Sequence, residues 1–288
     1  MKNENSYMKS PQQVVEYYIH SGVKKANTPA KILILLGLLG GIFIACGAAA
    51  SAVVSHAITN YSIAKLLGGI VFPVGLMMII FLGAELFTSD CLMVMGVMDQ
   101  QFKVIKMLKV LVIVYIANLV GAIIVSFLVY QSGQYDFSSG LLGAYTIKVA
   151  LGKVHLPFGT ALVSGIMCNI FVCAAALMAA AAKDISGKVW AIFFPIMAFV
   201  VSGYEHCIAN MYYIPSGIFA MGNDVYVQRA MSEYGYTTDQ LSQLTWGSFL
   251  LKNAIPVTLG NIIGGMLFVG VVLYFTHGRK IGATKNDM

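Results

Sequence analysis

Four stretches of this chain contain no Asp, Glu, Lys or Arg and are each long enough to cross a membrane. A helix of about 20 apolar residues spans about 30 Å of hydrocarbon. Over the whole chain of 288 residues, 58% are hydrophobic and only 10% are charged, which is not the composition of a soluble protein. We therefore predict a multi-pass protein that lies in the lipid bilayer. The uncharged stretches lie between Lys31 and Lys65, Lys109 and Asp136, Lys153 and Lys183, and Lys252 and Arg279.

The hydrophobic pattern predicts six spans, of which two are broken. Four simple spans are expected over residues 32–54, 108–130, 158–182 and 255–276. Two further apolar regions, 63–98 and 189–220, are too long for one simple helix and carry charged or helix-breaking residues near their middles. We interpret each as a discontinuous helix. The fold class expected is an all-α membrane protein.

The distribution of positive charge predicts the orientation of the spans. With six spans both termini lie on one side, and that side receives thirteen of the eighteen Lys and Arg residues. The positive-inside rule then places both termini in the cytoplasm of a cell inner (plasma) membrane. The first ten residues are polar and have no apolar core followed by a cleavage site, so we expect no removed signal peptide.

The two halves of the chain resemble each other in three short segments that occur in the same order. The segment that begins at Gly41 resembles the one at Asn169, Gly83-Ala84-Glu85 resembles Gly203-Tyr204-Glu205, and Asn118-Leu119-Val120-Gly121 resembles Asn261-Ile262-Ile263-Gly264. Three spans per half force the second copy to be inverted, and the broken helix is the middle member of each half. The domains expected are a cytoplasmic segment 1–29, a first repeat 30–130, an extracytoplasmic connection 131–157, a second repeat 158–276 and a cytoplasmic tail 277–288.

Polar residues gather at the two predicted breaks, residues 83–90 and 202–211. Irregular backbone at membrane depth must be shielded by protein or line a watery cavity, so both breaks face inward. The carboxylates there, Glu85, Asp90 and Glu205, could instead simply accept hydrogen bonds from free backbone amides at the helix ends. His206 is a functional candidate, because it lies beside a half-helix N-terminus, which attracts anions. No Lys or Arg is expected inside the spans, which favours rapid passage of an anion over tight binding.

At these breaks the sequence resembles the formate/nitrite transporter family. The resemblance covers about 14–274 and is carried by 83–89, 202–211 and 256–265. It implies an aquaporin-like fold, a symmetric homopentamer, and one pore per protomer for small monovalent anions. Two departures, Glu85 in place of a more common Asp and the sequence Tyr204-Glu205-His206-Cys207, make the chain most similar to the hydrosulfide channel branch.

The resemblance also implies roles for individual residues. Phe72, Leu76 and Phe199 would form an outer constriction, and Leu86 and Phe87 an inner one. Thr88 and His206 would face the ion between the constrictions, and Asn169 and Glu205 would support the histidine. Lys153 would attract anions at the outer mouth, to which topology adds Lys148. A titrating His206 would make the flux depend on pH.

Other readings of the sequence belong to different classes of protein. A channel for water or other neutral solutes shares the plan of six spans, but the paired asparagine-proline-alanine motif is missing. An intramembrane enzyme could use Glu205 and His206, but no metal-binding or nucleophile motif accompanies them. We expect no enzyme activity, no cofactor, no metal and no nucleic-acid partner. Before the first span, a capped amphipathic helix from Ser10-Pro11 to Gly22 would be an interfacial anchor or a lid.

Overall fold

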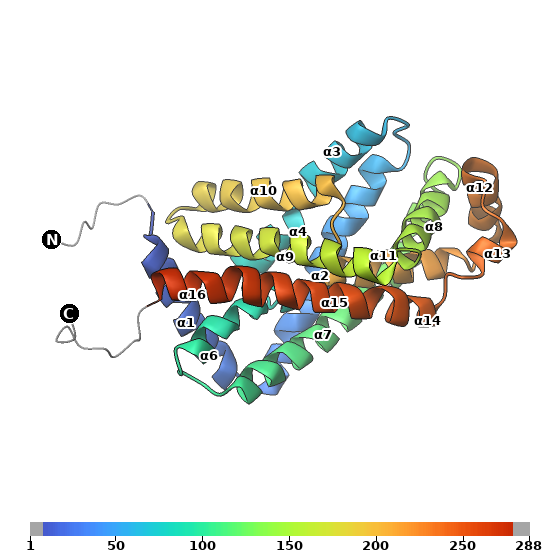
Figure 1. The fold of residues 1–288 in the computed structure, drawn as a ribbon. Coiled ribbons are helices and arrows are strands. Elements are labelled where there is room, and N and C mark those ends of the chain that lie inside the picture. The colour runs from blue at the N-terminus through green and yellow to red at the C-terminus, as the bar shows by residue number, and fades with distance from the viewer. Residues whose placement is uncertain (1–7, 279–288) are drawn as a thin grey trace, which may run out of the picture.

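The computed structural model describes residues 8–278, and within them every regular element is a helix (Figure 1). Six stretches there are long and apolar enough to cross a membrane. They are Ala30–Ser55, Tyr61–Leu82, Val104–Gln131, Phe158–Ala181, Ile185–Ser202 and Trp246–His277. The predicted fold class and the two broken helices are confirmed. The last stretch begins nearer the N-terminus than the predicted 255, because Thr245 caps a first turn that runs into the helix.

The helices range from single turns to 28 residues. They are α1 (Pro11–Asn27), α2 (Ala30–Ser55), α3 (Tyr61–Val71), α4 (Val74–Leu82), α5 (Phe87–Asp90), η1 (Cys91–Met93), α6 (Val94–Met98), α7 (Val104–Gln131), η2 (Gln134–Asp136), α8 (Leu141–Val154), α9 (Phe158–Ala181), α10 (Ile185–Ser202), α11 (Cys207–Ala220), α12 (Asp224–Tyr234), α13 (Thr238–Leu241), α14 (Trp246–Ser248), η3 (Phe249–Ala254), α15 (Ile255–Ile262), η4 (Ile263–Val271) and α16 (Val272–His277). In Figure 1, α1 and α16 lie at one end of the bundle, which we call the α1 end. Helices α8, α12 and α13 lie at the other, which we call the α8 end.

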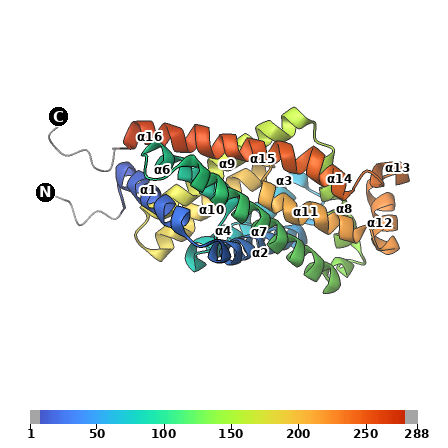
Figure 2. The same cartoon turned by 90° about the horizontal axis from the view of Figure 1, so that it is seen from below.

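Within each half of the chain, two long helices pack together through a glycine at an equivalent position, as expected of an inverted repeat. Helix α2 lies along α7, and α9 lies along α15 (Figure 2). A Cβ on Gly121 would lie 2.2 Å from the carbonyl oxygen of Leu38, and a Cβ on Gly264 would lie 2.2 Å from that of Ile166. These two glycines occupy the same place in the two matched segments. Only glycine allows the helix backbones to approach so closely.

Helix α1 has the predicted N-terminal cap but is longer than predicted. The Ser10 hydroxyl accepts from the Gln13 amide and Pro11 occupies the first turn. The helix continues past Gly22 to Asn27, so the predicted end at Gly22 is wrong. Gly22 serves close packing instead, because a Cβ there would lie 3.2 Å from the Phe102 ring. The helix ends before Thr28-Pro29, where the proline disfavours helical geometry in the residue before it.

The segment between the two repeats is largely helical and is part of the core. Helix α8 packs against α11, and Ile147, Ala150 and Leu151 on α8 are completely buried. Helices α12 and α13 follow α11 and cover the same end of the bundle (Figure 1). The α8 end therefore has a rigid wall, and Lys148 and Lys153 are held on it.

Candidate pore and its polar centre

Both helix breaks have the same backbone geometry. Helix α4 ends at Gly83 and α10 ends at Gly203, each with φ of 74°, a left-handed conformation that favours glycine. The chain is then extended through Leu86 and His206, and new helices begin at Phe87 and Cys207. The breaks lie where the sequence predicted them.

One asparagine from the following span stabilises each break. Asn118 Oδ1 accepts from the Phe87 amide at 3.1 Å, and its Nδ2 donates to the Glu85 carbonyl at 3.0 Å. Asn261 Oδ1 accepts from the Cys207 amide at 2.9 Å, and its Nδ2 donates to the Glu205 carbonyl at 3.0 Å. Each side chain satisfies a donor and an acceptor that the break leaves open. The sequence showed these asparagines as matched positions but not what they do.

His206 and Thr88 meet in the buried centre of the molecule. His206 Nε2 and Thr88 Oγ1 are 3.0 Å apart, and the Ala209 amide donates to His206 Nδ1 at 3.0 Å. An atom that accepts from an N–H carries no hydrogen of its own, so the hydrogen of the neutral ring is on Nε2. Nε2–H then donates to Thr88 Oγ1, and the hydrogen of the Thr88 hydroxyl is left for another acceptor. Protonation of Nδ1 would break the hydrogen bond from the Ala209 amide, which caps the N-terminus of α11.

A cavity of about 500 Å³ leads from the α8 end to this centre. Phe72, Phe199 and His206 are among the residues that line it. The Phe72 and Phe199 rings meet edge to face at 5.6 Å between centroids, and Phe199 stacks on the imidazole at 5.9 Å. Leu76 is equally buried but does not line the cavity. It follows Phe72 by one helical turn and so lies deeper in the bundle.

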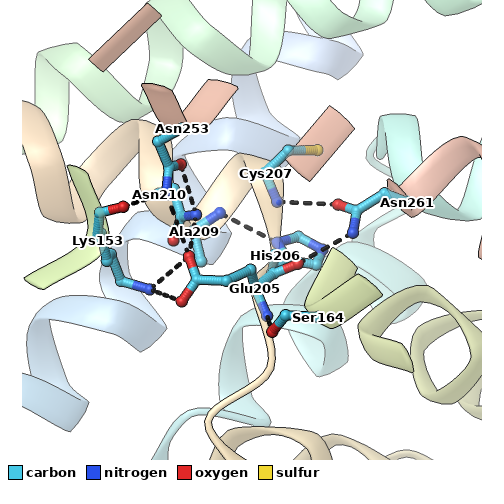
Figure 3. Close-up of polar contacts among 9 residues, drawn as sticks. All are labelled: Lys153, Ser164, Glu205, His206, Cys207, Ala209, Asn210, Asn253 and Asn261. Carbon is cyan, nitrogen blue, oxygen red and sulfur yellow. Dashed lines mark hydrogen bonds and ion pairs between the residues drawn. The ribbon is translucent and has the colours of Figure 1, made fainter. Parts of the chain in front are cut away.

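Lys153 and Glu205 form an ion pair beside the second break (Figure 3). Lys153 Nζ lies 2.9 and 3.1 Å from the two carboxylate oxygens, and Asn210 Nδ2 donates to Glu205 Oε2 at 2.6 Å. Asn253 Nδ2 donates to the Lys153 carbonyl at 3.0 Å. The charge of Lys153 is therefore compensated by a carboxylate that sequence reasoning had assigned to the support of the histidine.

Neither of the two residues expected to support His206 has a hydrogen bond to its ring within residues 8–278. Glu205 binds Lys153, as described, and precedes His206 in the chain. Asn169 Nδ2 donates to the carbonyls of Thr88 at 3.1 Å and Asn261 at 2.6 Å. Any support is therefore indirect: Asn169 positions the backbone of Thr88, the partner of the imidazole.

A second ion pair, which sequence reasoning missed, lies at the first break. Lys25 Nζ on α1 lies 2.5 Å from Glu85 Oε2 and 2.5 Å from Asp90 Oδ1. Burial lowers the pKa of Lys25, but the facing Asp90 and Glu85 carboxylates outweigh burial and raise it above its ordinary value. Lys25 corresponds in place to Lys153 at the other break, and only this symmetry could have indicated it. The ion pair ties α1 to the first break.

The residues of the predicted inner constriction lie directly after the first break. Leu86 is in the extended segment and Phe87 starts α5, and both side chains are buried. The Phe87 ring contacts Tyr115 edge to face at 4.9 Å between centroids. Within the repeat, Leu86 occupies the place that His206 takes in the second half.

Comparison with known proteins gives a consistent set of relatives. The sequence profile of the formate/nitrite transporter family matches residues 12–275. The chain is 35% identical to a probable formate transporter of Methanothermobacter thermautotrophicus, over 96% of this chain and 99% of that protein. It is 33% identical to the formate channel FocA of Escherichia coli K12, over 97% and 99% of the two chains.

Solved structures show the same architecture. A pentameric formate channel with formate bound has a TM-score of 0.74 and 33% identity, covering 87% of this chain and 98% of that chain. An FNT family ion channel has a TM-score of 0.76, covers 92% and 98% of the two chains, and is 24% identical, which shows the fold alone.

Six spans in two inverted repeats, with two broken helices that meet at a buried polar pair, define a transmembrane channel or transporter rather than an enzyme. The relatives are likewise channels and transporters. The chain belongs to the formate/nitrite transporter family.

Proposed function

We propose that this protein conducts small monovalent anions through a pore in each protomer. The observation that carries the proposal is a cavity lined by lysines that ends at an aromatic pair and a buried His206–Thr88 centre. Lysines at the mouth concentrate anions. Past the aromatic pair, no lysine or arginine among residues 8–278 lies within hydrogen-bond distance of the His206 ring or the Thr88 hydroxyl. An ion there meets neutral donors and is not held tightly.

The polar centre supplies hydrogen bonds that replace water around the ion. The neutral imidazole donates to Thr88 Oγ1, which leaves the hydroxyl hydrogen free to donate to an anion between the constrictions. Such a bond to a charged group contributes about 1.5–3 kcal/mol. This lowers the cost of stripping water from the ion at the apolar constriction without adding a fixed charge.

The substrate class we propose is formate, nitrite and hydrosulfide. Formate is supported by relatives named as formate channels. Hydrosulfide is supported by Glu85 and by the sequence Tyr204-Glu205-His206-Cys207, in which this chain departs from formate channels. Ion substitution in a planar bilayer tests the choice. Currents carried by formate, nitrite and hydrosulfide, with none carried by potassium or sodium, support this class. A current carried by potassium or sodium contradicts it.

We further propose that the protomer assembles as a homopentamer in the inner membrane with its α1 end in the cytoplasm. The solved relative at 33% identity is pentameric. Helix α10 is covered little within the protomer, with Trp190 and Phe194 each 56% exposed, as expected of a surface that meets lipid or a neighbouring copy. The protein mass of the solubilised complex, after subtraction of bound detergent, should be five times 31.0 kDa.

Leu76→Ala is expected to raise anion conductance and to admit a larger anion such as acetate. The side chain lies one turn below Phe72 and is buried, so its removal widens the path where the ion loses water. Single-channel conductance and acetate uptake measure the effect. Leu82→Ala is the matched control, because Leu82 is on the same helix and 65% exposed on the outer surface. Equal behaviour of the two variants would place the constriction elsewhere.

A further inference from the structure

The outer cavity carries more positive charge than its ion pair accounts for. Three lysines line it, Lys65, Lys148 and Lys153, and Glu205 is the one carboxylate among its lining residues. Glu205 holds Lys153 with both oxygens. Two positive charges therefore remain uncompensated inside a partly enclosed space, where they act on an ion more strongly than at an open surface.

Of the two remaining lysines, Lys148 is drawn towards the rim. Its Nζ lies 4.4 Å from the centroid of the Tyr234 ring, at the end of α12. Helix α12 covers the α8 end of the bundle (Figure 1). Lys148 is thus partly occupied by a cation–π contact at the entrance.

Lys65 lies instead beside the second helix break. Its Nζ is 3.3 Å from the point where a Cβ on Gly203 would stand, so the ammonium lies over the break that leads to His206. The absence of a side chain at Gly203 provides this space. Lys65 makes no ion pair and no side-chain hydrogen bond within the described part of the chain, and its Nζ lies 5.6 Å from the centroid of the Tyr61 ring.

An ammonium that lines a cavity and has no protein acceptor within the described part of the chain can donate hydrogen bonds to an anion that enters. Glu205, the carboxylate that lines the cavity, does not pair with Lys65, because it is already bound by Lys153, Asn210 and Asn253. We propose that Lys65 binds the permeating anion in the outer cavity, beside the second break and before the ion reaches the Phe72–Phe199 constriction. This inference rests on the proposed function, and it gives to Lys65 the role that the sequence alone suggested for Lys153.

The test compares three full-length variants in proteoliposomes with formate as the probe. Lys65→Met should raise the half-saturating formate concentration about tenfold, in line with the gain in local ion concentration that focused charge provides. It should also flatten the dependence of flux on ionic strength, since the screened charge is gone. Lys65→Arg keeps the charge and should restore both properties.

Lys252→Met is the matched control. Lys252 is exposed and does not line the cavity, so the same loss of charge there should leave the half-saturating concentration unchanged. A purely structural role of Lys65 would give an altered oligomer and no rescue of the salt dependence by arginine, and that result overturns the inference. So does a Lys65→Met channel with unchanged saturation and unchanged salt dependence while the original chain carries formate. If the original chain carries no anion, the proposed function fails and this inference fails with it.

Discussion

Replacing His206 with phenylalanine is expected to reduce anion flux about 10- to 100-fold while the oligomer still assembles. The aromatic ring keeps the stacking on Phe199 but donates nothing to Thr88. Without Nε2–H, the Thr88 hydroxyl is no longer held with its hydrogen towards the ion, so we expect the loss of about one hydrogen bond to a charged group. Such a bond contributes about 1.5–3 kcal/mol, and each 1.4 kcal/mol at the barrier changes the rate about tenfold. The measurement is formate uptake by proteoliposomes that contain equal amounts of assembled protein.

His206→Asn is the control that separates donation from titration. Asparagine can accept from the Ala209 amide, as His206 Nδ1 does, and it keeps one donor on its amide nitrogen. We expect its flux to persist, with altered selectivity between weak-acid and strong-acid anions and without any imidazole titration. Because Nδ1 accepts from an amide, we also expect the neutral ring to be the conducting form. Unchanged flux in an assembled His206→Phe channel would contradict the role given to the imidazole.

Lys153→Met is expected to lower the yield and thermal stability of the complex rather than to alter its salt dependence. The substitution leaves the Glu205 carboxylate buried without its cation, and breaking such a pair costs about 3 kcal/mol. Glu205 is also bound by Asn210, and its carbonyl accepts from Asn261, so disturbance there reaches the break itself. Thermal aggregation of the solubilised oligomer is the measurement.

The double variant Lys153→Met with Glu205→Gln is the control for this prediction. A neutral glutamine still accepts from Asn210 but carries no charge that needs a partner, so most of the lost stability should return. A single variant that is as stable as the original chain, but has lost the dependence of its flux on ionic strength, would show that Lys153 attracts anions and that the pair is not structural.

The spans and the two breaks could be predicted from the sequence because each leaves a local pattern. Uncharged runs of membrane length mark the spans, and Gly83 and Gly203 mark the ends of the half-helices with φ that glycine favours. The matched pair Asn118 and Asn261 indicated the repeat, and their hydrogen bonds show why the match exists.

The charge partners at the pore could not be predicted in the same way. Lys25 and Glu85 are far apart in the sequence, and so are Lys153 and Glu205, and nothing local indicates which carboxylate meets which lysine. In the sequence, Lys65 marked only the end of an uncharged stretch. Its role depends on the space above Gly203, which exists only once α3 packs against α10.

This protein is expected to conduct small anions, and neither to conduct water or neutral solutes nor to catalyse a reaction. Proteoliposomes that contain the purified full-length chain can be assayed side by side for formate uptake, for water and glycerol flux, and for hydrolysis of an ester. We predict rapid, saturable formate uptake well above that of empty liposomes, with water flux, glycerol flux and hydrolysis at the level of empty liposomes. Formate uptake no faster than through empty liposomes, together with rapid glycerol flux or ester hydrolysis, would contradict the account.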